Sequence, residues 1–166
     1  MHSPGLCINN GFNGAYLGGD GVSLFGVNSG GSRVGHPLVN GGVNYNSPTT
    51  GVDLNETSLE NAVIQIAAWT DERGLLIAAK PVKLVIPPSL MFTAKRLLDT
   101  ELRVATADND INAIKQMGAI PEGYTVNHFL TDPSAWFLTT DVPNGMKHFI
   151  RTPLQNSMDG DFDTAT

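Results

Sequence analysis

Four histidines are the side chains in this sequence that could bind a metal or move a proton, because imidazole does both near neutral pH. They stand at His2, His36, His128 and His148. None has a cysteine or a second histidine at the spacing of a zinc motif, and a zinc site needs three or four convergent ligands. We therefore interpret all four as surface or hydrogen-bonded histidines, and we expect no metal and no cofactor.

Three aspartates near residue 160 alternate like the first ligands of a calcium-binding loop: Asp159, Asp161 and Asp163. Such a loop requires glycine at its sixth position, where this sequence has Thr164, and a bidentate glutamate at its twelfth, which the sequence lacks. We interpret the three aspartates as a solvated acidic segment. Cys7 is the one cysteine, so no internal disulfide can form, and nothing marks a base that would make it a nucleophile.

Motifs of nucleotide-binding and acyl-transfer enzymes do not occur in the sequence. It has no Walker phosphate loop and no serine elbow, and the glycines between residues 11 and 21 do not join a strand to a helix. We therefore expect no catalytic and no cofactor-binding residues. One enzymatic alternative stays open, a small α+β hydrolase that pairs a histidine with an aspartate. Its candidates are His128 or His148 with Asp132 or Asp141.

The chain carries few charges, and their balance is acidic. Charged residues make up 16% of the sequence, and the net charge is -6. An average soluble domain has about 25%, so either a neighbouring molecule covers much of the surface or the surface is simply rich in glycine and asparagine. No basic cluster is longer than Lys95-Arg96, which argues against nucleic-acid binding. The apolar run 75–79 is far shorter than the ~20 residues that cross a bilayer, so we expect no membrane segment.

The composition of the chain changes near residue 53. Residues 1–52 contain 13 of the 18 glycines and only two charged residues, Asp20 and Arg33. Glycine and asparagine tolerate positive φ, so this segment should form turns and short extended pieces. It has no sustained apolar period. We therefore expect it to be the least well packed part of the chain and to make few contacts with the rest.

Regular helical spacing begins after residue 53. Asp53 or Asn55 can cap a helix over residues 56–73, and Gly74 stands where a left-handed cap would end it. Its apolar face should pack on a sheet through Leu59, Val63 and Ile66. A second helix is predicted from residue 87 to 99. Its apolar face is formed by Leu90, Ala94, Leu97 and Leu98.

The remaining elements are shorter. A third helix should carry Ile111, Ile114 and Met117, with Asp108 or Asn109 as its cap and Gly118 at its end. Strands are predicted at 75–79, 83–86, 124–126, 135–139 and 146–151, and Pro81 should separate the first two. Because residues 135–138 form a dense apolar stretch between turn signals, we expect Trp136 and Phe137 on a strand, at least one of them buried.

Four segments of this sequence, taken together, resemble the major capsid subunits of tailed bacteriophages, in particular the Mu-type prophage group. They are Gly21-Val22-Ser23-Leu24-Phe25 with His36-Pro37-Leu38; Asp53-Leu54-Asn55 with the helix that leads to Asp71-Glu72-Arg73-Gly74; Pro81 to Leu90 with Ala94 to Leu98; and Leu130 to Leu138. The resemblance, with the four segments in this order, extends over roughly residues 20 to 163.

The resemblance implies an α+β capsid-type fold, in which an axial domain of a small mixed sheet is flanked by helices. On that basis residues 54–145 are the axial domain, residues 1–53 are a Gly/Asn-rich peripheral segment of loops and short strands, and residues 146–166 return to the peripheral domain. A whole subunit of this group is longer and has a long spine helix. The resemblance therefore also implies a partial chain with incomplete peripheral segments.

The function implied by the resemblance is structural. Such subunits self-assemble into pentamers and hexamers of an icosahedral capsid that encloses the DNA genome, and they have no catalytic activity. The partners would be copies of the chain itself, with scaffold, portal or decoration proteins as further partners. The location would be the virion, after assembly in the bacterial cytoplasm. The alternative within the same fold is the shell protein of a cellular nanocompartment.

Overall fold

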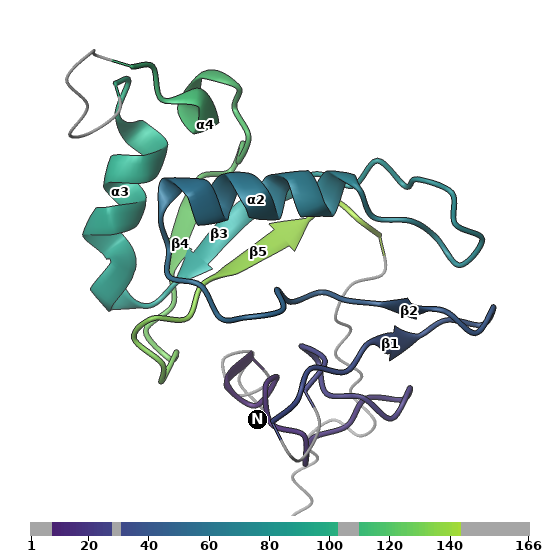
Figure 1. Cartoon of the computed structure of the whole chain (residues 1–166). Helices are drawn as coiled ribbons and strands as arrows, with labels where there is room; N and C mark the ends of the chain where they lie inside the picture. Colours follow the sequence, from purple (N-terminus) through teal and green to yellow (C-terminus); the bar gives the residue numbers. More distant parts are fainter. Residues whose placement is uncertain (1–7, 28–30, 103–109, 144–166) are drawn as a thin grey trace, which may run out of the picture.

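The computed structural model describes residues 8–27, 31–102 and 110–143, and Figure 1 shows the arrangement of their elements. In chain order these are β1 (His36–Pro37), β2 (Val43–Asn44), α2 (Glu56–Ala67), β3 (Pro81–Ile86), the 3-10 helix η1 (Pro88–Leu90), α3 (Met91–Asp99), α4 (Ala113–Gln116), β4 (Tyr124–Val126) and β5 (Phe137–Thr140). The predicted strand 146–151 lies outside the described residues.

The first turn of α2 is fixed by a reciprocal capping box. The side chain of Asn55 accepts a hydrogen bond from the backbone N–H of Ser58 at 2.8 Å, and the Ser58 hydroxyl accepts one from the N–H of Asn55 at 3.0 Å. Glu56 adds a negative charge at the positive end of the helix. Of the two caps that the sequence offered, Asn55 is therefore the cap and Asp53 is not.

The predicted end of this helix at residue 73 is wrong, because α2 ends at Ala67. The chain then forms a tight turn in which the Asp71 carboxylate accepts hydrogen bonds from the N–H groups of Arg73 and Leu75. Gly74 has φ +82°, so it serves this turn and does not cap the helix. A side chain that competes for backbone donors in this way favours a turn over helix.

Residues 75–79 do not form the predicted strand. They contribute one isolated antiparallel bridge, Leu76 to Thr70, flanked by the hydrogen bonds Asp71 N to Leu75 O and Ile77 N to Trp69 O. The resulting hairpin spans residues 70–77, and Ala78 ends the extended backbone with φ +50°. The three apolar side chains Leu75, Leu76 and Ile77 are exposed. A single bridge is too short a ladder to form a strand.

The central sheet is mixed, as predicted, with the strand order β4-β3-β5. Strand β3 runs parallel to β4, with Leu84 opposite Tyr124, and antiparallel to β5, with Leu84 opposite Leu138. Pro81 begins β3 and does not separate two strands, and the register shifts between Pro81 and Lys83. A proline is tolerated at the first position of a strand because its missing N–H costs no ladder bond there.

The core lies between one face of this sheet and the helices. Leu84 and Ile86 are two residues apart on β3, so they share a face, and both are fully buried beside Leu59 of α2. In Figure 1, α2 crosses the sheet and α3 stands beside β4. The buried apolar cluster consists of Leu54, Leu59, Leu84, Ile86, Ala94, Ile114 and Ile120. Ile66 is also buried and Val63 is half-buried, so the predicted apolar face of α2 is confirmed.

The predicted helix 87–99 is confirmed as η1 followed by α3. Ala94 is buried, and Leu90, Leu97 and Leu98 pack against the core cluster. The third helix is shorter than predicted. Its cap is Asn112, whereas Asp108 and Asn109 lie outside the described residues. Since α4 makes little more than one turn, only one apolar side chain faces the core: Ile114 is buried, while Ile111 and Met117 are exposed. Gly118 follows its end with φ +60°, as expected.

Strand β5 begins at Phe137, so Trp136 lies just before the strand and not on it. Both side chains are half-buried, and neither reaches full burial. The indole of Trp136 packs against the core cluster, and its Nε1–H donates to the carbonyl oxygen of Val52 at 2.9 Å. The bond joins the indole to the C-terminal end of residues 1–52.

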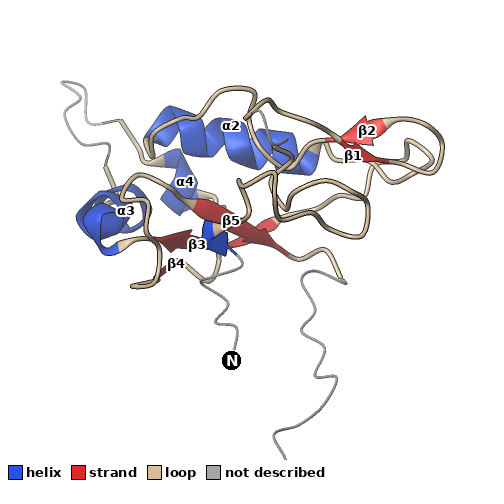
Figure 2. Cartoon of the chain, turned by 90° about the horizontal axis from the view of Figure 1, so that it is seen from below, coloured by secondary structure: helices blue, strands red, loops and turns tan. Residues whose placement is uncertain are grey.

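We call residues 1–53 the Gly-rich segment. Its described part consists mostly of turns and short strand pairings. β1 and β2 form a two-stranded antiparallel sheet, and isolated bridges join Leu17 to Ser23 and Val27 to Arg33. Figure 2 shows β1 and β2 at the side of the molecule opposite α3. A Cβ on Gly35 would lie 2.6 Å from the Cβ of Val43, so β1 approaches β2 closely only because residue 35 has no side chain.

Candidate functional site

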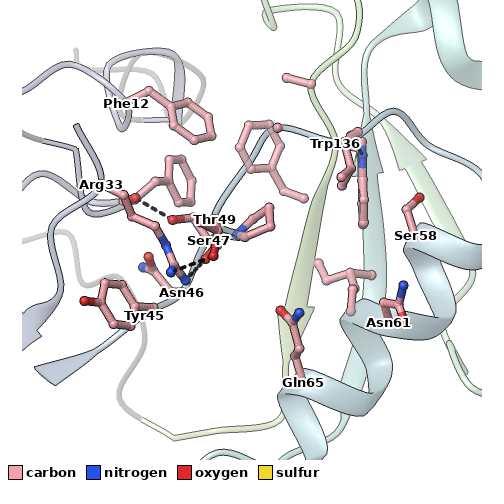
Figure 3. Close-up of a pocket in the computed structure, with 18 of the residues that line it drawn as sticks. Phe12, Arg33, Tyr45, Asn46, Ser47, Thr49, Ser58, Asn61, Gln65 and Trp136 are labelled. Carbon is pink, nitrogen blue, oxygen red and sulfur yellow. Dashed lines mark hydrogen bonds between the residues drawn. The ribbon is translucent and has the colours of Figure 1, made fainter. Parts of the chain in front are cut away.

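A concavity in the described part of the chain lies between residues of the Gly-rich segment on one side and α2 and β5 on the other. It has a volume of about 630 Å³, and Figure 3 shows the residues that line it. Amide and hydroxyl side chains and aromatic rings dominate the lining, notably Asn46, Ser47, Asn61, Gln65, Trp69 and Trp136. We refer to this concavity as the cleft.

Arg33 forms the charged part of the cleft wall. Its Nη1 donates to Thr49 Oγ1 at 3.2 Å, its Nη2 donates to the carbonyl oxygen of Ser47, and its guanidinium carbon lies 3.8 Å from the ring centroid of Tyr45. Figure 3 shows these contacts as one group on the Gly-rich side. A planar guanidinium can donate and stack at the same time. The contacts tie together residues 45–49, so the arginine has a structural role here.

Three phenylalanines link the Gly-rich segment to the sheet. Phe12 and Phe25 have ring centroids 4.5 Å apart, and both rings meet Phe137 of β5, at 6.0 Å and 5.1 Å. Asn9 adds two hydrogen bonds, to Phe129 O at 2.7 Å and from Thr131 N at 3.1 Å. The structure therefore differs from the expectation of few contacts, because side chains of this segment supply cohesion that its glycines cannot.

The opposite wall of the cleft is the polar face of α2. Asn61 and Gln65 are one helical turn apart and exposed, so their amides can both donate and accept hydrogen bonds. The carboxylate of Asp132 also lies in the lining, and hydrogen bonds from the backbone and hydroxyl of Ser134 hold its pKa below the usual aspartate range. The amide and hydroxyl groups of this lining can donate and accept hydrogen bonds, and its charged residues are Arg33, Asp53 and Asp132.

His36 lies beside Asp20, a pairing that no motif in the sequence announced. Its Nδ1 is 2.6 Å from Asp20 Oδ2. This hydrogen bond is the main reason that the pKa of Asp20 lies below its ordinary value, and the backbone N–H of Val22 acts in the same direction. The Nε2 of His36 is buried and has no partner among the described residues. The pair joins β1 to the turn at residue 20, so it braces the fold.

The structure does not assemble the hydrolase alternative from the residues that it describes. His128 is exposed, Asp132 is hydrogen-bonded to Ser134, and the carboxylate of Asp141 accepts the backbone N–H of Lys80 at 2.8 Å. Several of the candidate residues lie outside the described residues: His2, Cys7, His148, Asp159, Asp161 and Asp163. Within 8–27, 31–102 and 110–143, no group of three His, Cys, Asp or Glu side chains could hold a metal ion.

A search of the same residues for membrane spans finds no helix with the length and apolar character to cross a bilayer.

Comparison with known proteins gives one match. Residues 41–121 match the family model of the Mu-like prophage major head subunit gpT. This part of the chain, just under half of it, is similar to the Mu-like major head subunit family. The matched region begins before β2 and includes α2, β3, α3 and α4, which means that it contains most of the buried core. No curated protein and no solved structure shows significant similarity to the chain.

The match to the Mu-like major head subunit family agrees with the resemblance found in the sequence. Two of the four segments that carry the resemblance lie wholly inside residues 41–121: Asp53 to Gly74, and Pro81 to Leu98. The family is one of structural head proteins, so the chain is similar to proteins that form the virion capsid.

Proposed function

We propose that this chain is a structural subunit of an icosahedral phage capsid, in which its copies assemble into pentamers and hexamers that enclose the DNA genome. The observation that carries the proposal is the match of residues 41–121 to the Mu-like major head subunit family. In this proposal the chain has no catalytic activity, binds no metal or cofactor, and reads no nucleic-acid sequence.

The surface of the chain supports a self-associating role. Large apolar side chains are exposed on several elements, among them Leu75, Leu76, Phe92 and Phe129. Exposed apolar clusters on a soluble chain mark surfaces that another molecule covers. A shell subunit contacts several neighbours at once, which also accounts for a sequence in which only 16% of the residues are charged.

We further propose the capsid-type division of the chain. Residues 54–145 form the axial domain, and residues 1–53 and 146–166 belong to the peripheral domain. The support is that every member of the buried apolar cluster lies between Leu54 and Ile120. The Gly-rich segment packs on this unit through the phenylalanine contacts and contributes no residue to the cluster.

The proposed partners are copies of the chain itself, with scaffold, portal and decoration proteins as further partners during head assembly in the bacterial cytoplasm. The shell protein of a cellular nanocompartment is the second candidate, because it would share the fold. The family match favours a phage head, since it is a head subunit family.

Analytical ultracentrifugation and negative-stain electron microscopy of the purified chain, over a range of protein concentrations, test the proposal. We expect ring-shaped species of five or six copies at intermediate concentration and closed shells at high concentration. A chain that stays monomeric at every concentration would overturn it. Particles isolated from the native host cells separate the two candidates by their content, since DNA is expected inside a phage head and protein cargo inside a nanocompartment.

A further inference from the structure

The hairpin 70–77 presents apolar side chains that the described residues of its own copy leave exposed. Leu75 is 64% exposed and Leu76 is 71% exposed. The hairpin is nevertheless held in place, because the amides of Asn40 and Asn44 donate to the carbonyl oxygens of Glu72 and Thr70. A braced hairpin with an open apolar side is a preorganised contact surface, since little entropy is lost when a partner covers it.

The charge at the tip of this hairpin is acidic. Asp71, Glu72 and Arg73 follow one another there. The Asp71 carboxylate is occupied by backbone donors of the turn. The carboxylate of Glu72 has no hydrogen-bond or ion-pair partner among the described residues. The hairpin therefore combines an apolar patch with a negative charge that is available to a partner.

The outer face of α3 has the complementary composition. Phe92 is 68% exposed, and Arg96 stands one helical turn further on the same face and is also exposed. Lys95 is neutralised by its ion pair with Asp99, whereas the Arg96 guanidinium has no partner among the described residues. This face therefore combines an apolar ring with an available positive charge.

The two surfaces lie at opposite ends of the molecule. In Figures 1 and 2, α3 is at one side, and in Figure 1 the loop that follows α2 projects at the other side. One copy cannot bring them together. Successive copies can, and two different patches that meet head to tail generate a closed ring when the rotation between copies closes.

We propose that the hairpin 70–77 of one copy packs on the outer face of α3 in the next copy, with Leu75 and Leu76 against Phe92 and Glu72 paired with Arg96. The inference rests on the proposed function and specifies one of its subunit contacts. Each patch offers on the order of a few hundred Å² of apolar surface, below the ~800 Å² per partner of a stable free dimer. The contact is therefore weak alone and strengthened by ring closure.

Charge reversal tests the pairing. We expect Glu72→Arg and Arg96→Glu each to raise the protein concentration needed for half-assembly about tenfold, because like charges then face each other across the contact. Combining the two variants should restore assembly to near the parent value. Asp110→Arg is the matched control: it makes the same change of charge as Glu72→Arg at an exposed residue outside both surfaces and should leave assembly unchanged.

Sedimentation velocity gives the assembly midpoint of each variant, and thermal melting checks that it folds. Single variants that assemble like the parent, or a double variant no better than the singles, would overturn the contact while the proposed function stands. A parent chain that never assembles would overturn both. Cross-linking gives an independent measure. In a Cys7→Ser background, Leu76→Cys with Phe92→Cys should form a covalent ladder of oligomers on oxidation, and Leu76→Cys with Phe129→Cys should not.

Discussion

Phe25 and Phe137 stack with ring centroids 5.1 Å apart, although one belongs to the Gly-rich segment and the other to the last described strand. Phe12 joins the same group. The cluster explains how a segment with so many glycines is held against the sheet without contributing to the buried apolar cluster: three rings supply the apolar contact area that the glycines lack.

Phe25→Ala should loosen this attachment. We expect faster hydrogen exchange in residues 8–27 and unchanged exchange in α2 and β3, because the buried cluster contains no residue of the Gly-rich segment. Tyr16→Ala is the control, since Tyr16 is exposed and lies outside the ring cluster. Exchange that rises equally in α2 would mean that the segment and the core unfold as one unit.

Leu59→Ala should destabilise the chain by ~2–5 kcal/mol, because it leaves a cavity under α2 where the side chain is fully buried. Ile64→Ala on the exposed side of the same helix should change stability by no more than ~0.5 kcal/mol. Urea denaturation followed by circular dichroism measures both. Equal effects of the two variants would show that the buried face of α2 has been assigned incorrectly.

Asn112→Ala should lower the free energy of unfolding by more than the loss of an ordinary helix cap does. The Asn112 amide donates to the carbonyl oxygens of Leu97 at 2.7 Å and Thr100 at 3.0 Å, and its oxygen accepts from the N–H of Lys115. Because Asn112 is buried, removing its amide leaves the carbonyl groups of Leu97 and Thr100 without donors. We expect this loss to lower the free energy of unfolding by ~2–3 kcal/mol. Asn55→Ala should cost ~1 kcal/mol. Thermal melting that ranks the two in reverse order would contradict this account.

The pairing of Asp20 with His36 predicts a pH-dependent contribution to stability. The pKa of Asp20 is lower in the folded state than its ordinary value, so the unfolded state binds the proton more tightly. The contribution is present above the ordinary aspartate pKa and is lost as the pH falls through the lower folded value. At about pH 6, Asp20→Asn should be less stable than the parent by ~0.5 kcal/mol, the scale of a partly exposed pair.

Denaturant titrations of the parent and of Asp20→Asn, at about pH 6 and again below pH 3, measure this difference. It should shrink at the lower pH, where the parent carboxyl is protonated as well. A difference that stays constant across the two conditions would show that the carboxylate form of Asp20 has no stabilising role.

The elements that could be predicted from the sequence are those whose signals are local. The capping box of Asn55 and Ser58 joins neighbours within one turn, and the apolar spacing around Leu59 and Ala94 identifies the buried faces of α2 and α3. The mixed sheet and the α+β class also agree with the prediction. Hydrophobic period and capping act over three or four residues, so they can be recognised before the chain path is known.

The candidate site was not predictable in the same way. The cleft, the stack of Phe25 on Phe137 and the pairing of Asp20 with His36 join residues that no motif or periodicity connects. In these contacts the partner is chosen by where the chain returns in space. The functional conclusion came from the likeness of whole segments to a family, since the individual polar residues marked no site.

The sequence by itself determined where the two longer helices begin, which of their faces are apolar, and that the chain resembles phage head subunits. Tertiary structure alone decided that α2 stops at Ala67, that Leu75 and Leu76 stay exposed on a hairpin, and that Trp136 lies just before the strand and bonds Val52. The physical reason is that local conformational preferences compete with contacts between distant parts of the chain. A local preference is worth a few tenths of a kcal/mol per residue, and one side-chain hydrogen bond or buried ring contact exceeds it.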